Sequence, residues 1–302
     1  MRAAEGSRVG FSGAVALPSL RELGELRVIE LLERALGTSP CTVIGFGDDV
    51  SAVKLPNGNV AVLKTDMLVG STDVPPGMTM KQAARKTVVM NVSDLAAKGV
   101  RPLAGMVALG LPANMTQRDV KGIAEGLHDG AEEYGFPLVG GDTNESKDLT
   151  IAIALFAIAN RKQLVLRSGA RVGDVVAVTG EFGTASSGLK ALLEKNARKL
   201  AKPLRNAVYY PKAQLSLGLK LAASGSLTAS IDSSDGLAWS LHELSNESKV
   251  GILVDNIPVS KAARNFAARW GYHANDLALY GGEEYHLVVT VKHGKFRSAI
   301  RA

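Results

Sequence analysis

Gly45-Phe46-Gly47-Asp48-Asp49, in this 302-residue chain, combines two glycines with two adjacent carboxylates. The glycines on either side of Phe46 permit backbone angles that other residues resist, so main-chain groups can come close to a ligand here. The adjacent carboxylates offer four oxygens, which suit a hard cation such as Mg²⁺. The stretch therefore predicts either a metal and phosphate anchor or a simple β-turn between strands expected at residues 42–44 and 50–55.

The composition is that of an ordinary globular protein, with 46% hydrophobic and 21% charged residues. Its length allows two domains. The single cysteine, Cys41, excludes a disulfide within the chain and a zinc site built from several cysteines. This cysteine usage favours a cytoplasmic location.

The net charge of +6 comes from scattered Lys and Arg residues, and aromatic residues make up 5% of the chain. Without a basic run or an aromatic platform, the excess charge indicates a solvated surface that also favours anionic substrates, rather than a nucleic-acid-binding face. No run approaches the ~18–20 apolar residues of a membrane span, so no membrane association is expected. Gly10 and Gly13 interrupt the apolar stretch near the start, and a flexible extension is expected at residues 1–21.

The spacing of apolar residues predicts helices and strands along the whole chain. In the first half, helices are expected at residues 22–36, 79–97 and 116–134, and strands at 42–44, 50–55, 59–64, 103–111, 136–139 and 149–159. In the second half, helices are expected at residues 184–194, 211–223, 237–245 and 261–270, and strands at 175–179, 227–231, 251–254 and 285–291. This mixture predicts an α/β or α+β fold with a boundary near residues 160–167.

Carboxylates recur in one setting. Asp66, Asp142 and Asp232 each come just after an apolar strand in this interpretation and stand next to small residues. Ligand sites in α/β proteins favour the loops beyond strand ends, and carboxylates that converge there repel one another unless cations neutralise them. The recurrence therefore favours a shared metal site over a series of ordinary turns.

Asp94 and Asp235 are ambiguous from the residues alone. Asp94 lies within an expected helix among apolar neighbours, and Asp235 precedes another helix. Each is either a metal ligand or an acid satisfied by a cap or a buried hydrogen bond. The stretch from Gly183 to Lys190 resembles a P-loop, but Leu189 breaks the required Gly-Lys pair, which favours an ordinary helix start.

Six motifs follow one another along the chain. They are Gly47-Asp48-Asp49, Lys64-Thr65-Asp66, Asn91-Val92-Ser93-Asp94-Leu95-Ala96-Ala97, Gly140-Gly141-Asp142-Thr143, Arg167-Ser168-Gly169-Ala170 and Asp232-Ser233-Ser234-Asp235-Gly236-Leu237. Their order and approximate spacing, from about Glu22 to Val291, resemble the thiamine-monophosphate kinase family. That family belongs to the wider superfamily of aminoimidazole ribonucleotide synthetase.

The resemblance implies a synthetase-like fold of two α/β domains. Residues 22–160 would form an ATP- and metal-binding domain that pairs with a second copy of the chain, giving a homodimer with a shared barrel, and residues 161–302 would form the second domain. The implied reaction is direct in-line transfer of a phosphoryl group from ATP to thiamine monophosphate, giving thiamine diphosphate. Mg²⁺ is the implied cofactor, and no side chain is expected to form a covalent intermediate.

The resemblance also implies roles for individual residues. The implied magnesium ligands are Asp49, Thr65, Asp66, Asp94, Asp142, Asp232 and Asp235. The residues implied to contact ATP are Gly141, Asp142, Arg167 and Ser234. Asp73, which stands where many family members carry a histidine, and Glu283 are implied on the substrate side. Two alternatives stay open: another ATP-dependent small-molecule synthetase of the superfamily, and a non-catalytic nucleotide-binding protein.

Overall fold

The structure is a computed structural model that describes residues 19–194 and 200–300. Among these residues, those up to Pro40 and those from Cys41 onward form two separate units. The extension expected at residues 1–21 lies outside the described residues as far as residue 18. In the first unit, helix α1 (Leu20–Leu36) confirms the helix expected at residues 22–36, and it is kinked at Gly24.

Six strands of the second unit form one sheet in the order β1-β2-β3-β6-β4-β5. The strands are β1 (Thr42–Ile44), β2 (Ser51–Lys54), β3 (Asn59–Val69), β4 (Ala104–Pro112), β5 (Leu138–Ser146) and β6 (Thr150–Asn160). Neighbouring strands are antiparallel, except that β4 and β5 are parallel. In β6, Ile151, Ile153 and Leu155 are buried at every second position, so one face of the sheet lies in the core.

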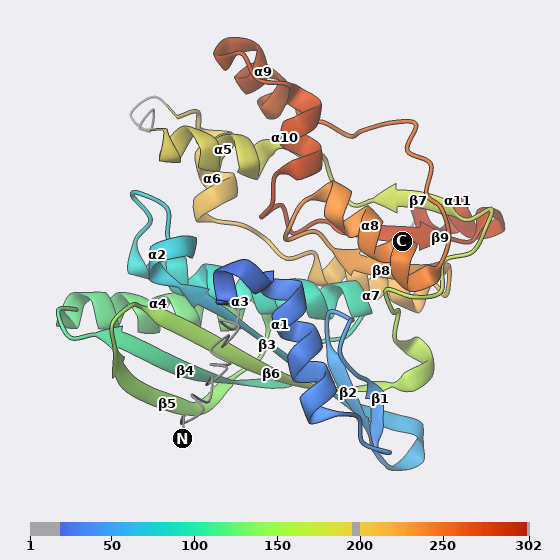
Figure 1. Ribbon diagram of the computed structural model, residues 1–302, viewed down its shortest axis with the longest axis horizontal. Helices are drawn as coiled ribbons and strands as arrows, with labels where there is room; N and C mark the ends of the chain where they lie inside the picture. Colours follow the sequence, from blue (N-terminus) through green and yellow to red (C-terminus); the bar gives the residue numbers. More distant parts are fainter. Residues whose placement is uncertain (1–18, 195–199, 301–302) are drawn as a thin grey trace, which may run out of the picture. The chain divides into compact units, whose positions relative to one another are not determined.

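Helix α3 (Met80–Lys98) is the central element of this core. It packs against β3 and β6, against the helix α4 (Gln117–Tyr134) and against β8 of a second sheet. Figure 1 shows α3 and α4 on the same side of the six-stranded sheet. Thr79 and Gln82 form a capping box at its start, and Gly99 ends it with a left-handed φ of 68°. Side chains on nearly all of its faces are buried, including several polar ones.

The second sheet has three antiparallel strands in the order β7-β9-β8. They are β7 (Val175–Val178), β8 (Leu227–Asp232) and β9 (Leu287–Val291). The remaining helices are α2 (Gly70–Asp73), α5 (Thr184–Leu193), α6 (Lys202–Tyr209), α7 (Leu215–Ala223), α8 (Leu237–Ser248), α9 (Lys261–Trp270), α10 (Ala274–Tyr280) and α11 (Phe296–Ile300). Strands and helices mix throughout, which confirms the α/β class.

Three features differ from the sequence predictions. The strand expected at residues 251–254 is wrong: no described strand pairs with this segment, and Leu253 is 88% exposed. The helix expected at residues 211–223 begins only at Leu215. The helices α2, α6, α10 and α11 were not predicted. They are short, and α6 gains its stability by packing against α5, a contact that no local pattern reveals.

The prediction that Asp66, Asp142 and Asp232 come just after strands is also wrong. Asp232 is the last residue of β8, and Asp66 and Asp142 lie inside strands β3 and β5. The apolar runs end before these residues, but the backbone pairing continues past them along β6 and β4. Within the described ranges, no helix combines the length and apolar character that crossing a membrane requires.

Candidate functional site

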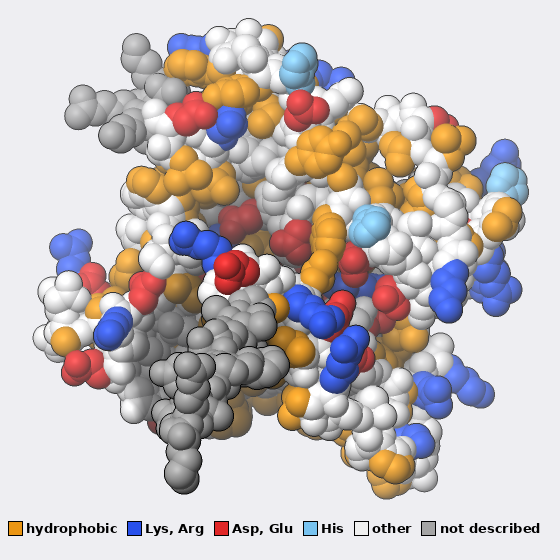
Figure 2. All heavy atoms as spheres, in the orientation of Figure 1, with side chains coloured by type: hydrophobic (Ala, Val, Ile, Leu, Met, Phe, Trp, Pro, Cys, Tyr) orange, Lys and Arg blue, Asp and Glu red, His pale blue; other side chains and the backbone are white. Residues whose placement is uncertain are grey.

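Three buried carboxylates from three elements converge. Asp49 lies in the turn between β1 and β2, Asp94 lies in α3, and Asp232 is the last residue of β8. One oxygen of each lies within 4.8 Å of the others. Figure 2 shows acidic side chains recessed in a hollow on the face that it draws. We call Asp49, Asp94 and Asp232 the carboxylate cluster.

The glycine-flanked turn serves this cluster. Gly47 has a φ of 93°, a left-handed conformation that favours glycine. The turn directs Asp49 inward, and the backbone N–H of Asp49 donates to Asp48 Oδ1 at 2.8 Å. Asp48 Oδ2 accepts from the backbone N–H of Arg167 at 3.1 Å. The stretch is therefore both a turn and part of the site.

Two cationic side chains compensate the charge of Asp49. Lys98 on α3 is fully buried, and its Nζ lies 2.6 Å from Asp48 Oδ1 and 2.8 Å from Asp49 Oδ2. The Nε of Arg167 donates to Asp49 Oδ1 at 2.6 Å, and its Nη1 donates to Glu243 Oε2 at 3.1 Å. These contacts fix the turn of the first half against residues of the second half.

Lys64 bridges two further carboxylates. Its Nζ lies 2.9 Å from Asp66 Oδ1 and 2.8 Å from Asp94 Oδ2. Burial lowers the pKa of Lys64, but Asp94 and Asp66 outweigh that effect and raise the pKa above its ordinary value. Lys64 therefore stays protonated. The backbone N–H of Asp66 donates to Asn91 Oδ1 at 2.9 Å, which ties β3 to α3.

The carboxylates at the site outnumber these cations, because Asp48, Asp66 and Glu243 share Lys64, Lys98 and Arg167 with the cluster. Burial raises the pKa of Asp94 well above its ordinary value, and the neighbouring Asp232 raises it further, against the lowering effect of Lys64. Burial likewise raises the pKa of Asp232 to about 7, and Asp49 adds to the shift. Oxygen ligands that repel one another in this way fit a hard divalent cation such as Mg²⁺, which would favour their ionised form.

Thr65 lies outside the carboxylate cluster. Side chains alternate along β3, so Lys64 and Asp66 lie on the face that also carries the buried Leu68, and Thr65 lies on the opposite, exposed face. The side chain of Thr65 therefore does not point toward Asp94.

Asp142 shares that opposite face. The register places Asp142 beside Ala108, which pairs through Ala152 with Met67 of β3, two residues beyond Thr65. Asp142 is exposed, and its Oδ2 accepts from Asn144 Nδ2 at 2.9 Å. The metal-ligand roles of Thr65 and Asp142 stay predictions.

Two backbone segments expected to contact ATP have special geometry. A Cβ at Gly141 would stand 1.8 Å from the carbonyl oxygen of Val107, so this position in β5 requires glycine. Ser234 and Asp235 are exposed in the segment between β8 and α8, directly after Asp232. Gly236 follows them with a φ of 103°.

The two residues expected on the substrate side are joined by a residue that the sequence analysis did not select. Lys86 on α3 makes an ion pair with Glu283 and donates to the carbonyl oxygen of Asp73 at 3.1 Å. The carboxylate of Asp73 accepts from the backbone N–H of Val69 at 2.7 Å. The structure therefore brings the Asp73 and Glu283 segments to one place.

Four functional candidates were missed: Lys64, Lys86, Lys98 and Glu284. Lys86 and Lys98 stand in a helix whose other faces are buried, and a lysine in such a helix requires a carboxylate partner. That signal was present in the sequence. The sequence carries no such signal for Glu284, because the groups around its carboxyl belong to α5, which is distant in the chain. Burial raises the pKa of Glu284 to about 7, although the backbone N–H groups at the start of α5 lower it, with Ala185 N donating to Oε1 at 2.9 Å.

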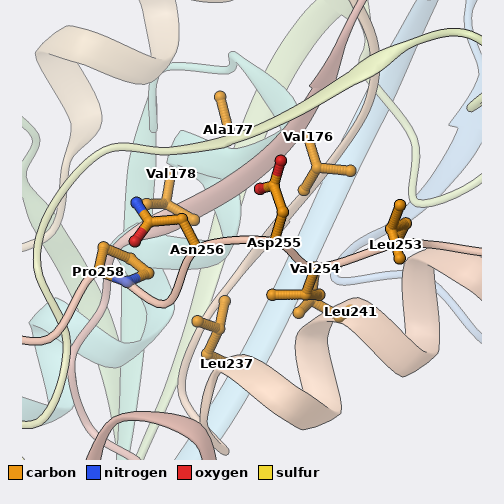
Figure 3. Close-up of a pocket in the computed structure, with 10 residues that line it drawn as sticks. All are labelled: Val176, Ala177, Val178, Leu237, Leu241, Leu253, Val254, Asp255, Asn256 and Pro258. Carbon is orange, nitrogen blue, oxygen red and sulfur yellow. The ribbon is translucent and has the colours of Figure 1, made fainter. Parts of the chain in front are cut away.

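A separate cavity of about 260 Å³ lies in the second half of the chain. Figure 3 shows that aliphatic side chains form most of its lining, with Asp255 and Asn256 as polar groups. No candidate site residue lines it.

His286 has a structural role in the second half of the chain. Burial lowers its pKa, and its ring lies edge-on to Phe182 with the centroids 5.4 Å apart.

Comparisons with known proteins agree with this geometry. The family model described as AIR synthase related protein, N-terminal domain, matches residues 47–159. The chain is 37% identical over 281 residues to a thiamine-monophosphate kinase of Nitrosopumilus maritimus, covering 91% of this chain and 86% of that one. It is 39% identical over 248 residues to a thiamine-monophosphate kinase of Pyrococcus horikoshii, covering 82% and 77%.

A solved structure described as AaThiL complexed with AMPPCP and TMP superposes with a TM-score of 0.83 at 28% identity, covering 93% of this chain and 89% of that one. The match in sequence thus extends over most of the chain, and the match in structure extends equally far. The chain belongs to the thiamine-monophosphate kinase family.

Proposed function

We propose that this protein transfers the γ-phosphoryl group of ATP to thiamine monophosphate, giving ADP and thiamine diphosphate. The proposal rests on the similarity to thiamine-monophosphate kinases over most of the chain, together with the convergence of Asp49, Asp94 and Asp232. The similar structure contains AMPPCP, an analogue of ATP, and TMP. The alternatives of another synthetase activity or a non-catalytic protein gain no support from a specific observation.

The carboxylate cluster and Asp66 would hold Mg²⁺. Asp235 and, on the opposite face of the sheet, Thr65 and Asp142 are proposed as ligands of further Mg²⁺ ions. Mg²⁺ bound there would neutralise charge on the phosphate chain of ATP and on the transferring group. Lys64 and Lys98 keep the carboxylates of Asp94 and Asp49 in place through their ion pairs. The chain itself thus contributes a preorganised array of charge, which spares reorganisation during the reaction.

Contacts to ATP are proposed for Gly141, Asp142, Arg167 and Ser234. Arg167 has five N–H donors, and its contacts to Asp49 and Glu243 use one N–H each of Nε, Nη2 and Nη1, so the remaining N–H groups can reach a phosphate oxygen. The close approach of Gly141 to β4 leaves no room for a side chain beside the nucleotide. Ser234 is exposed next to Asp232 and can donate its hydroxyl.

The reaction needs alignment more than proton transfer. A phosphate oxygen of thiamine monophosphate is already anionic, attacks the γ-phosphorus of ATP, and the bond from that phosphorus to the bridging oxygen breaks to release ADP. Asp73 and Glu283 would orient the substrate, whose thiazolium ring carries a positive charge that a carboxylate attracts. No covalent enzyme intermediate is part of the proposal.

The homodimer, the domain division at about residue 160 and the cytoplasmic location belong to the same proposal. The six-stranded sheet supports the dimer, because the face opposite Lys64 and Asp66 exposes apolar side chains. They are Leu63, Met67, Met106 and Ile158, each between 46% and 57% exposed. An apolar sheet face of this kind is typical of a subunit interface.

The proposal is tested by mass-spectrometric detection of thiamine diphosphate after incubation of the protein with ATP, Mg²⁺ and thiamine monophosphate. Asp66→Asn and Asp142→Asn are expected to abolish turnover while circular dichroism shows an intact fold. Absence of product with the parent protein would overturn the proposed function. Full activity in both variants would overturn the metal assignment alone.

A further inference from the structure

Lys86 is a buried cation to which the proposed reaction assigns no role. Its side chain is 1% exposed and lies in the first half of α3. A buried ammonium group without partners is costly, so its contacts are not incidental. Its partners are the carboxylate of Glu283, through Oε1, and the backbone carbonyl of Asp73 at 3.1 Å.

These partners come from segments far apart in the sequence. Asp73 ends the short helix α2, which follows β3, and Glu283 lies in the segment between α10 and β9. Since the carboxylate of Asp73 already accepts from Val69 N, Lys86 holds that segment through its backbone. One ammonium group thus fixes both segments that we expect on the substrate side.

Glu283 itself is held in an unfavourable backbone conformation. Its φ is 67°, in the left-handed region that residues with a side chain rarely adopt. Its backbone N–H donates to the carbonyl oxygen of Ser234 at 2.6 Å, and a Cβ at Gly282 would stand 2.3 Å from that same oxygen. The segment is therefore pressed against the Ser234 segment of the proposed ATP site, and its strain persists because several contacts determine it.

The side chain of Glu283 is 26% exposed, so it is reachable from outside, whereas Lys86 is not. Oε1 is engaged by Lys86, and within the described residues no contact is found for Oε2. A cationic ring can approach Oε2 while Lys86 holds the carboxylate in its orientation through Oε1. Lys86 thus acts behind Glu283 and does not touch the substrate.

We propose that Lys86 is a positioning residue that fixes Glu283 and the Asp73 segment for binding of a substrate with a cationic heteroaromatic ring. This inference rests on the proposed function, since it takes thiamine monophosphate as that substrate. It assigns to α3, beyond its carboxylate Asp94, a second task of shaping the acceptor subsite. Removing the ammonium group frees Glu283 and weakens the acceptor's binding, while the ATP contacts stay in place.

The test compares Lys86→Met, Lys86→Arg and the control Lys81→Met. Lys81 lies on the same helix, is about half exposed, and its ion pairs are to Glu125 and Asp129 of α4. We expect Lys86→Met to raise KM for thiamine monophosphate at least roughly tenfold, with KM for ATP changed less than about twofold. Lys86→Arg should restore much of the loss, because it keeps the positive charge. Lys81→Met should match the parent protein.

Two further measurements keep the inference testable if Lys86→Met folds poorly. Glu283→Gln should reproduce the selective rise in KM, and adding Lys86→Met to it should cause little further rise, because both act through one contact. Calorimetric titration with thiamine monophosphate should show the same loss of affinity without turnover.

Several results would overturn the inference. They are an unchanged KM in folded Lys86→Met, an equal rise in both KM values, failure of Lys86→Arg to restore binding, and additive effects of Lys86→Met and Glu283→Gln. If the parent protein makes thiamine diphosphate, such results refute only the role proposed for Lys86 and leave the proposed function in place. A parent protein that makes none refutes the proposed function, and this inference with it.

Discussion

Asp232 differs from the other carboxylates of the cluster in its lack of a cationic partner. Asp49 pairs with Lys98 and Arg167, and Asp94 pairs with Lys64, whereas no ion pair to Asp232 is found in the described part of the chain. Its pKa of about 7 lies well above the ordinary 3.8 because the side chain is buried and lies near Asp49. Above pH 7 its negative charge therefore opposes folding unless a cation is bound.

We expect Asp232→Asn to stabilise the protein in chelator at pH 8 by on the order of a few kcal/mol, since it removes this buried charge. The same variant should lose most of the stabilisation that Mg²⁺ gives the parent protein, because a ligand is gone. Thermal unfolding with chelator and with Mg²⁺ measures both effects. Asp255→Asn, in the separate cavity, is the control. Equal Mg²⁺ stabilisation in the Asp232 variant and the parent would contradict the metal assignment.

Glu284 gives a prediction about pH. Its pKa is raised from 4.5 to about 7 in the folded protein. Between these values the folded state holds a proton that the unfolded state has lost, so the stability from this group is full below about pH 4.5 and is lost as the pH rises toward 7. Glu284→Gln cannot titrate and escapes this loss.

The substitution Glu284→Gln changes the free energy of unfolding at both pH values. That change should favour the variant by roughly 2–3 kcal/mol more at pH 8 than at pH 5. Urea unfolding at both values measures the difference. The exposed Glu247→Gln serves as the control and should show a pH profile parallel to the parent. A parallel profile for Glu284→Gln as well would show that this carboxyl group titrates normally.

At the scale of elements, α3 contributes to both parts of the site. Asn91, Asp94 and Lys98 follow one another at spacings of three and four residues, so they share one face of the helix. Lys86 lies nearer its start and serves the Glu283 segment. The position of α3 between the two sheets therefore controls the cluster and the proposed acceptor subsite together.

The end of α3 offers a direct test of that packing. Gly99 and Gly135 end α3 and α4 with similar left-handed φ values of 68° and 73°. A Cβ at Gly99 would lie 2.1 Å from the Cβ of Ala222 in α7, whereas a Cβ at Gly135 would meet nothing within 4 Å.

Gly135→Ala should cost about 1 kcal/mol of unfolding free energy through backbone strain alone. Gly99→Ala should cost clearly more, because α7 must also move away from α3. Denaturant unfolding of the two variants measures the difference directly. If both variants lost the same stability, the close packing of α3 against α7 would be disproved.

At the scale of the whole molecule, the exposed face of the six-stranded sheet predicts the dimer. Met67 is 57% exposed on β3, and the register places it on the face opposite Asp66. A buried glutamate at that position would be unpaired at the interface and costly. We expect the parent protein to be a homodimer by light scattering and Met67→Glu to be a monomer with an unchanged circular dichroism spectrum.

Leu253→Glu is the matched control, since Leu253 is an exposed apolar residue in the second half of the chain. It should remain dimeric. A parent protein that is monomeric and fully active would remove the reason for a shared barrel. A dimer that survives Met67→Glu would place the interface on another face.

The sequence by itself determined the long elements and the cluster's main members. Strong periodicity and clear caps located α1, α3 and α4 to within about two residues, because a capped amphipathic or apolar run is a local property. Asp49, Asp94 and Asp232 were identified through motif order, and the structure brings them within 4.8 Å.

Only the tertiary structure decided which side chains compensate that charge. The cations pair with carboxylates that lie mostly on other elements; these cations are Lys64, Lys86, Lys98 and Arg167. Burial, which no local stretch of sequence reveals, raises the pKa values of Asp94, Asp232 and Glu284. The two faces of the sheet were also invisible in the sequence: Asp66 and Asp142 looked alike, but strand register separates them. Pairing and burial join residues that are distant in the chain, whereas a motif records only order and spacing.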